Sequence, residues 1–154
     1  MRRVWRLCKR RYAASAFDGE GARRYGGRWN PPGVRAVYAS ETISLATLEA
    51  LVHVDPADAP TDLVVIPVDI PDDLAVTHVT LRVLPRNWRS APGPTRLQQV
   101  GVNWVRAGKT AVLSVPSVLV PQERNYLLNP EHPDFARIKH GRPQPFSIDL
   151  RLYG

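Results

Sequence analysis

Residues 21–40 read GARRYGGRWNPPGVRAVYAS, a glycine-rich run that passes directly into an alternating apolar run. The glycines, together with the closing Pro-Pro-Gly, predict a long irregular loop over residues 13–33. Aromatic side chains within the loop disfavour disorder, and loops of this length inside a compact domain commonly carry function. Residues 34–39 predict a strand that places Tyr38 on one face by the two-residue period.

A helix is expected directly after this strand. Ser40 offers a side-chain oxygen as the N-cap, and the carboxylate of Glu41 suits the positive end of a helix. Apolar residues then recur at helical spacing over residues 43–54. Glu49 falls at the border of this apolar stripe, where an ordinary solvated side chain is the simplest interpretation. Residues 55–61, rich in Pro, Ala and Asp, predict a connector.

The rest of the chain predicts short strands and one more helix. Thr95 is expected to cap a helix over residues 96–107, with Gly108 as its stop. Pro67 favours an edge position or a bulge for its strand. The expected strands cover residues 4–8, 63–70, 74–84, 111–114, 118–120 and 146–152, with a loop at 85–94. Six or seven short strands and two main helices favour an α+β fold with a mixed or mainly antiparallel sheet.

Length and composition are typical of one globular domain over residues 1–154. The chain is 44% hydrophobic and 23% charged. Its single cysteine, Cys8, excludes a disulfide framework and a cysteine-rich zinc site. No apolar run approaches the roughly 20 residues of a membrane helix, and basic residues at 6 and 9–11 interrupt any signal-peptide core. We therefore expect a cytoplasmic protein.

The net charge of +7 is concentrated in the first quarter of the chain. Residues 1–35 hold ten Arg or Lys against Asp18 and Glu20, whereas residues 36–154 hold eleven basic and twelve acidic side chains. A local positive field suits RNA, DNA, a nucleotide pyrophosphate or an acidic protein, and it does not choose among them. A solvated basic face without a ligand is the remaining interpretation.

Motifs of common nucleotide-dependent and metal-dependent enzymes do not occur in the sequence. Gly19 and Gly21 match the first two glycines of a dinucleotide fingerprint, but Arg24 occupies the third position. There is no phosphate-binding GxxxxGK[ST] loop, no HExxH, and no metal-ligand spacing among the four histidines. We therefore expect neither a Rossmann domain nor a metal site.

Five residues stand out as candidates for chemistry, and each also has a purely structural interpretation. Arg28 follows two glycines that let a ligand approach the backbone, and its planar fork suits phosphate oxygens. A solvated loop arginine is the alternative. Tyr38 could equally be an ordinary core residue, and Glu49 a solvated residue at the edge of its helix. Ser117 and Asn129 stand beside prolines and could simply form turns.

Several segments, in this order along the chain, resemble one known family. Besides residues 21–40, they are LATLEALVH at 45–53, LPRNWR at 84–89 and PSVLVPQERNYLLNPEHPDF at 116–135. Together they are similar to the RES domain, the toxin half of bacterial RES/Xre toxin–antitoxin systems. The resemblance runs from about residue 5 to residue 152, so the chain is identified as a single RES domain over residues 1–154.

The resemblance implies a fold related to ADP-ribosyltransferases and an activity that consumes NAD. Members of the family degrade NAD by hydrolysis or phosphorolysis, or transfer ADP-ribose to a protein, so NAD is a substrate, phosphate a potential co-substrate, and no cofactor is expected. An Xre-type antitoxin is expected to block the active site. A homodimer or a larger toxin–antitoxin assembly fits the family, whereas membrane contact and direct nucleic-acid binding are not expected.

The family takes its name from Arg, Glu and Ser positions, which fall here on Arg28, Glu49 and Ser117, and its functional tyrosine falls on Tyr38. The nicotinamide ring already carries a positive charge in NAD and leaves as a neutral molecule, so that no general acid is needed and one carboxylate at the ribose suffices. Glu49 is expected to hold the 2'-hydroxyl and stabilise the oxocarbenium charge, and Arg28 to pair with the pyrophosphate.

Tyr38 is expected to stack on nicotinamide or the adjoining ribose. Ser117 is expected to form a hydrogen bond with the nicotinamide amide or the ribose, with Asn129 supporting that wall of the site. An RNA-targeting toxin and a non-catalytic module with an acidic partner remain as alternatives. No motif identifies the acceptor as water, phosphate or a protein side chain.

Overall fold

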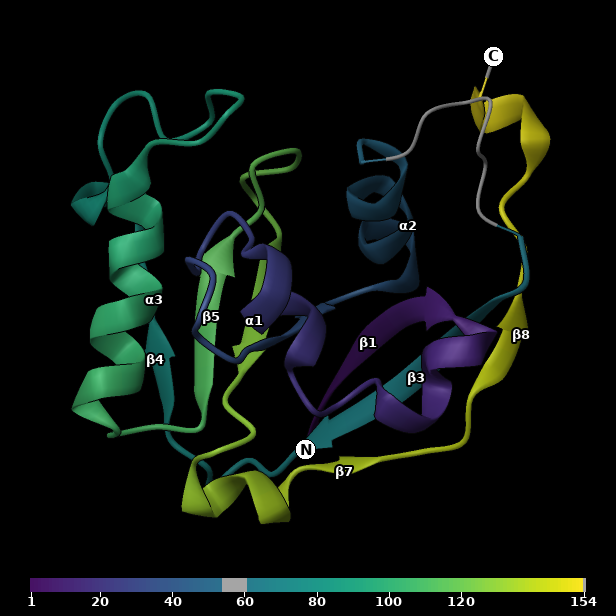
Figure 1. Cartoon of the computed structure of the whole chain (residues 1–154), viewed down its shortest axis with the longest axis horizontal. Coiled ribbons are helices and arrows are strands. Elements are labelled where there is room, and N and C mark those ends of the chain that lie inside the picture. The colour runs from purple at the N-terminus through teal and green to yellow at the C-terminus, as the bar shows by residue number, and fades with distance from the viewer. Residues whose placement is uncertain (54–60, 154) are drawn as a thin grey trace.

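A computed structural model describes residues 1–53 and 61–153, and the strands among them form one sheet (Figure 1). The order of the strands is β4-β5-β6-β2-β1-β3-β7, and β8 also pairs with β3. Within this described part the β4–β5 pair is parallel and the other pairs are antiparallel. The expected α+β fold with a mainly antiparallel sheet is therefore confirmed.

The strands are β1 (Arg2–Lys9), β2 (Val37–Ser40), β3 (Leu63–Ile70), β4 (Val76–His78), β5 (Val112–Pro116), β6 (Arg124–Leu128), β7 (Lys139–His140) and β8 (Gln144–Phe146). The α-helices are α1 (Glu20–Tyr25), α2 (Ile43–Leu51) and α3 (Thr95–Ala107). Short 3-10 helices are η1 (Arg10–Ser15), η3 (Leu81–Val83), η4 (Pro133–Arg137) and η5 (Leu150–Tyr153).

Pro67 lies on β3, whose pairing is continuous on one side and interrupted on the other. β1 pairs with β3 over its full length, including Trp5 opposite Pro67. On the far side, β7 pairs with Val68 and Asp69 and β8 pairs with residues 63–65, so that Pro67 lies between the two short strands. The expected edge position is therefore wrong for the strand as a whole. Pro67 is tolerated because, within the described residues, no strand pairs with it on that side.

Two predictions for the second half of the chain were wrong. Residues 118–120 form a bend that leads into a turn at residues 121–122 rather than a strand, and β6, which was not predicted, follows that turn. The C-terminal residues 146–152 contribute only the end of β8 and most of η5. β6 is central and pairs with both β2 and β5, so its apolar residues run continuously instead of alternating with polar ones.

The glycine-rich loop contains regular structure that was not predicted. Part of η1 and all of α1 lie within residues 13–33. Gly19 and Gly26, with φ of +74° and +69°, stand at the two ends of α1. Both glycines have positive φ angles, which side chains disfavour, and so mark the start and the end of the helix. The irregular parts of the loop are thus residues 16–19, before α1, and residues 26–33, after it.

The N-terminal caps of the two longer helices differ from the predictions. Thr42, not Ser40, caps α2, because its Oγ1 accepts a hydrogen bond from Leu45 N at 3.0 Å. Glu41 instead accepts from Arg124 N at 2.6 Å. Thr95 is the first residue of α3, which has no side-chain cap. α2 ends at Leu51, before the predicted residue 54, and residues 55–60 of the predicted connector lie outside the described residues.

The sheet separates two apolar clusters, and the candidate site lies on the α3 side. Side chains of alternate residues on the central strands point to opposite faces. One cluster contains Val4, Val37, Val68 and Leu128. The other packs Leu97 and Trp104 of α3 against residues of β5, β6 and the glycine-rich loop, including Trp29 and the ring of Tyr38. α3 lies beside β4 (Figure 1), and its packing on β5, β6 and Trp29 holds the loop against the sheet.

Candidate functional site

The carboxylate of Glu49 is held at one oxygen by two side chains from the sheet. Its Oε1 accepts a hydrogen bond from Ser117 Oγ at 2.8 Å and another from Asn125 Nδ2 at 2.7 Å. α2 brings Glu49 to the point where β5 ends and β6 begins. Among the described residues no hydrogen bond reaches Oε2. The arrangement orients a half-buried carboxylate through one of its oxygens.

The Ser117 hydroxyl is fully engaged within the protein. Besides donating to Glu49, its Oγ accepts hydrogen bonds from Leu119 N and Val120 N, both at 3.1 Å. A serine hydroxyl has one donor and two acceptor positions, and all three are occupied. The side chain is 0% exposed. Ser117 thus supports Glu49 and, in this structure, has no hydrogen-bonding capacity left for the substrate contact expected of it.

Asn125 is a site residue that the sequence analysis missed. It lies on β6 opposite Ser40 of β2, whose Oγ donates to Asn125 Oδ1 at 2.7 Å. This contact orients the amide so that Nδ2 faces Glu49. Predicting β6 and its pairing with β2 would have located Asn125, because that pairing places position 125 opposite the end of β2. Ser40, which was predicted to cap α2, instead forms this hydrogen bond with Asn125.

Tyr38 anchors the glycine-rich loop through its hydroxyl. The hydroxyl donates to Asn30 Oδ1 at 2.6 Å and accepts from Trp29 N at 3.1 Å. A Cβ on Gly27 would lie 2.7 Å from this oxygen, so that only glycine fits there. Burial raises the pKa of the Tyr38 phenol well above its usual range, and the side chain is therefore neutral.

Arg28 extends from the same loop toward residues 88–93. Its Nη1 donates to the carbonyl oxygens of Trp88 at 3.2 Å and Ser90 at 3.0 Å. A Cβ on Gly93 would lie 2.6 Å from that nitrogen, so the guanidinium packs closely on the glycine. Within the described part of the chain, Nε and Nη2 form no hydrogen bond. The guanidinium is thus held through Nη1, and the geometry of Nε and Nη2 suits hydrogen bonds to an anion.

Four of the five predicted residues share one region of the α3 face of the sheet. Glu49 and Ser117 are in direct contact. Tyr38 lies two residues before Ser40 on β2, so that the two side chains point to the same face. Arg28 belongs to this region because the next residue, Trp29, donates its backbone N–H to the Tyr38 hydroxyl.

Asn129 lies at the other end of the β5–β6 ladder. Pro116 pairs with Arg124 near Ser117, whereas Val112 pairs with Leu128 next to Asn129. The Oδ1 of Asn129 accepts from Glu131 N at 3.0 Å, which is a local turn contact. The structure therefore does not bring Asn129 to the Glu49–Ser117 wall that it was expected to support.

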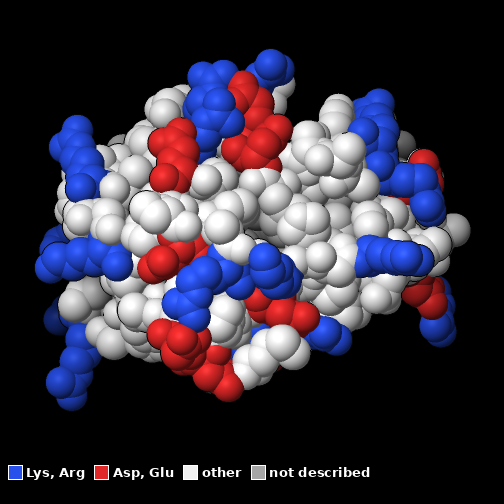
Figure 2. All heavy atoms as spheres, turned by 90° about the horizontal axis from the view of Figure 1, so that it is seen from below, with Lys and Arg blue, Asp and Glu red and all other residues white. Residues whose placement is uncertain are grey.

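Much of the basic charge in the first quarter of the chain is paired. Arg3 contacts Asp69 and Arg10 contacts Asp62, both at 2.8 Å. Figure 2 shows basic and acidic side chains interspersed over one face of the molecule. Because neighbouring carboxylates offset this charge, the local net charge is a weak argument for nucleic-acid binding.

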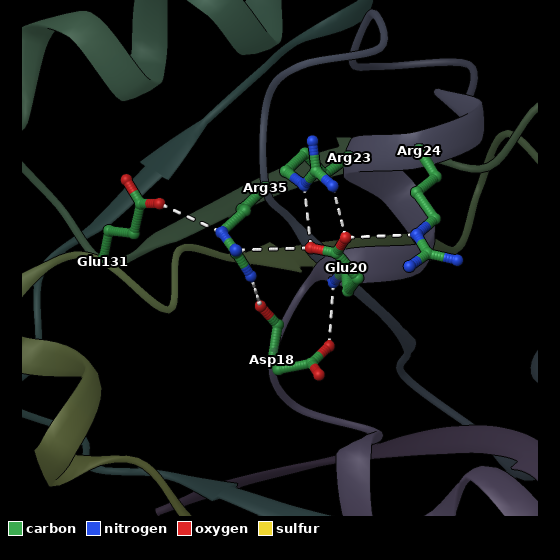
Figure 3. Close-up of polar contacts among 6 residues, drawn as sticks. All are labelled: Asp18, Glu20, Arg23, Arg24, Arg35 and Glu131. Atoms are coloured by element: carbon green, nitrogen blue, oxygen red, sulfur yellow. Dashed lines mark hydrogen bonds and ion pairs between the residues drawn. The ribbon is translucent and has the colours of Figure 1, made fainter.

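An ion-pair cluster surrounds Glu20 on α1 (Figure 3). The carboxylate contacts Arg23, Arg24 and Arg35, the last two at 3.2 and 3.3 Å. Hydrogen bonding to Arg23, followed by the contributions of the other arginines, lowers the pKa of Glu20 to about 2. Glu131 also contacts Arg35 at 3.3 Å. These contacts tie α1 to the segment that leads into β2.

Neither a clustered metal-ligand set nor a membrane helix is present among residues 1–53 and 61–153. No three His, Cys, Asp or Glu side chains gather there in an arrangement suited to a metal ion. No helix of that part of the chain is long and apolar enough to cross a membrane.

Comparisons with known proteins match one family over nearly the whole chain. The RES domain family matches residues 3–149. Toxin Res of Yersinia enterocolitica is 38% identical over 150 residues, which cover 97% of this chain and 98% of that protein. A Sphingobium protein named Prs ADP-ribosylating toxin is 38% identical over 152 residues, covering 96% and 94%.

A solved structure has the same fold. It is the M. tuberculosis MbcT–MbcA toxin–antitoxin complex, in which one chain superposes with a TM-score of 0.76 at 20% sequence identity. The match covers 98% of this chain and 86% of that chain. At this level of identity the similarity establishes the fold alone.

Proposed function

The chain belongs to the RES domain family, and on this basis we propose that it is the toxin of a toxin–antitoxin pair that cleaves the nicotinamide glycosidic bond of NAD. The relatives named Toxin Res support the first part of this proposal. The arrangement around Glu49 supports the second part and is the observation on which it rests.

A single oriented carboxylate suits this reaction. Nicotinamide departs from a positively charged linkage, so the leaving group needs no proton and the transition state develops positive charge on the ribose. Glu49 Oε2 would accept a hydrogen bond from the ribose 2'-hydroxyl and stabilise that charge, because Oε1 is already held by Ser117 and Asn125. The carboxylate does not have to reorganise during the reaction.

Arg28 and Tyr38 would bind and orient the rest of NAD. Nε and Nη2 of Arg28, which have no hydrogen bond within the described residues, would form charge-assisted hydrogen bonds with the pyrophosphate. The hydroxyl of Tyr38 is occupied by the loop, so we assign its contact with nicotinamide or the adjoining ribose to the face of the ring. Ser117 would act on the substrate only through Glu49.

The acceptor of ADP-ribose defines two candidate reactions. Water or phosphate as the acceptor would make the protein an NAD glycohydrolase or phosphorylase, with phosphate as a co-substrate. A host protein as the acceptor would make it an ADP-ribosyltransferase. The Sphingobium relative, named for ADP-ribosylation, favours this second candidate specifically.

One experiment separates these reactions. The purified protein is incubated with NAD, with and without phosphate and with and without a cell extract, and the products are resolved by mass spectrometry. Free ADP-ribose indicates hydrolysis, ADP-ribose phosphate indicates phosphorolysis, and a protein that gains ADP-ribose indicates transfer. NAD that stays intact under all four conditions contradicts the proposal.

The proposed partner is an antitoxin of the Xre type that covers the active site in the cytoplasm. A toxin–antitoxin complex with the same fold is consistent with such a partner. Adding the purified antitoxin should stop the loss of NAD. An RNA-targeting toxin is the weaker alternative, and RNA degradation by the purified protein without NAD would favour it.

A further inference from the structure

We infer that Asn125, held by Ser40, is a positioning residue that fixes the rotation of the Glu49 carboxylate. This inference deepens the proposed function, because it concerns the same carboxylate. It rests on three side chains connected in series by two short hydrogen bonds. Ser40 Oγ donates to Asn125 Oδ1 at 2.7 Å, and Asn125 Nδ2 donates to Glu49 Oε1 at 2.7 Å.

Ser40 determines which end of the Asn125 amide faces Glu49. An asparagine amide turned by 180° would present its oxygen instead of its nitrogen to the carboxylate. The hydroxyl of Ser40 is buried at the end of β2 and donates to the amide oxygen. Nδ2 is therefore directed at Glu49. Without the Ser40 hydroxyl, the Asn125 amide can turn and place its Oδ1 against the Glu49 carboxylate oxygen.

Asn125 and Ser117 approach Glu49 Oε1 from different parts of the fold. Ser117 is anchored in the turn after β5 by Leu119 N and Val120 N, whereas Asn125 is anchored in the sheet by Ser40. The last torsion of a glutamate side chain is broad, so a single hydrogen bond leaves the plane of the carboxylate free to rotate. Two donors with separate anchors fix that plane, and with it the direction of Oε2.

The kinetic test uses Asn125→Ala, Ser40→Ala and the double variant in the full-length protein. A carboxylate displaced by about 1 Å commonly costs up to about 100-fold in turnover. We expect kcat for NAD loss to fall about 10- to 100-fold in Asn125→Ala, with KM changed less than about threefold. The fall in kcat should be smaller in Ser40→Ala than in Asn125→Ala. The double variant should be no worse than Asn125→Ala, because Ser40 acts only through Asn125.

Asn103→Ala is the matched control. Asn103 is an exposed asparagine on α3 whose Oδ1 accepts from Gln99 Nε2 at 2.8 Å, away from Glu49. It should keep the parent kcat. A folded Asn125→Ala variant with the parent kcat contradicts the inference, and so do losses that add up in the double variant. Ser40→Ala changes less of the sheet and decides the question if Asn125→Ala does not fold.

A second readout does not depend on NAD. The side-chain amide protons of Asn125 should resonate downfield in the NMR spectrum and exchange slowly in the parent. Both properties should be lost in Glu49→Ala and weakened in Ser40→Ala. An amide signal that is the same in parent and Glu49→Ala contradicts the inference even if the parent consumes NAD. A parent that leaves NAD intact contradicts the proposed function, and the NMR result then decides the positioning contact by itself.

Discussion

Gly101 of α3 packs directly on the backbone of the loop at Trp29. A Cβ added to Gly101 would lie 1.8 Å from the Trp29 carbonyl oxygen, closer than two such atoms can approach. On the same helix, Gln98 Nε2 donates to Gly27 O at 3.1 Å and to Asn30 O at 3.3 Å. α3 thus fixes the position of the loop that carries Arg28.

We expect Gly101→Ala to destabilise the protein despite the higher helix propensity of alanine. Propensity favours the substitution by about 1 kcal/mol, whereas overpacking commonly costs about 1–3 kcal/mol and more when backbone atoms must move. The free energy of unfolding in urea measures the balance. Gly21→Ala is the control, because that position on α1 has open space around it and should be neutral or slightly stabilising. Equal stability of parent and Gly101→Ala would show that the loop moves freely.

Tyr38→Phe removes the hydroxyl that joins the loop to β2. Asn30 Oδ1 and Trp29 N both lose their partner, and an unsatisfied buried polar group costs about 1–3 kcal/mol. We expect lower stability in urea and weaker binding of NAD, because Arg28 adjoins the loosened segment. Tyr25→Phe is the control, since Tyr25 is 82% exposed and should change stability by less than about 0.5 kcal/mol. A Tyr38→Phe variant with parent stability and affinity would contradict the anchoring role.

Local patterns in the sequence predict much of the fold. Alternation locates β1, and helical spacing locates α2 and α3, with Gly108 ending α3 as expected. α1 escaped prediction because Gly19 and Gly26 suggest a loop until their positive φ angles place them at the helix ends.

Local sequence patterns predict less of the candidate site than of the fold, because the contacts of the site join segments that are far apart in the chain. Glu49 and Ser117 are 68 residues apart in the chain, so no spacing rule connects them. Asn125 becomes visible only once β6 is paired with β2. The resemblance points to Glu49 as the carboxylate of the site. The occupied hydrogen bonds of Ser117 and the position of Asn129 at the distant end of β6 emerge only from the three-dimensional arrangement.

The stability of the protein should depend on Glu20 above about pH 2. The pKa of Glu20 in the folded state is lowered to about 2 from a model-peptide value of 4.5, first by its hydrogen bond with Arg23. A lowered folded-state pKa means that ionised Glu20 favours the folded state above pH 4.5 and that this contribution is lost as the pH falls toward 2. We expect the urea midpoints of parent and Glu20→Gln to differ at neutral pH and to converge in acid. A constant difference across this range would contradict the assignment.

Arg28→Ala should weaken the binding of NAD more than it slows turnover. Two nitrogens of the guanidinium form no hydrogen bond with the residues that the structure describes and would bind the pyrophosphate in the proposed function. Charge-assisted hydrogen bonds contribute about 1.5–3 kcal/mol each. We expect KM to rise about 10- to 100-fold, with a smaller change in kcat. Arg96→Ala, which removes an exposed arginine of α3, is the control and should keep the parent KM. Unchanged affinity for NAD in Arg28→Ala would remove Arg28 from the phosphate-binding role.

Glu49→Gln should abolish most of the NAD loss and leave the fold intact. The amide has nearly the same size as the carboxylate and keeps an oxygen for Ser117 and Asn125, but it carries no charge to stabilise the oxocarbenium ion. Removing one such preorganised electrostatic contact commonly costs about 100- to 1,000-fold in turnover. The rate of NAD loss and the thermal midpoint are measured together, with Glu131→Gln as the control because Glu131 is an exposed partner of Arg35 away from this contact. Turnover at the parent rate in folded Glu49→Gln would exclude the carboxylate from the reaction.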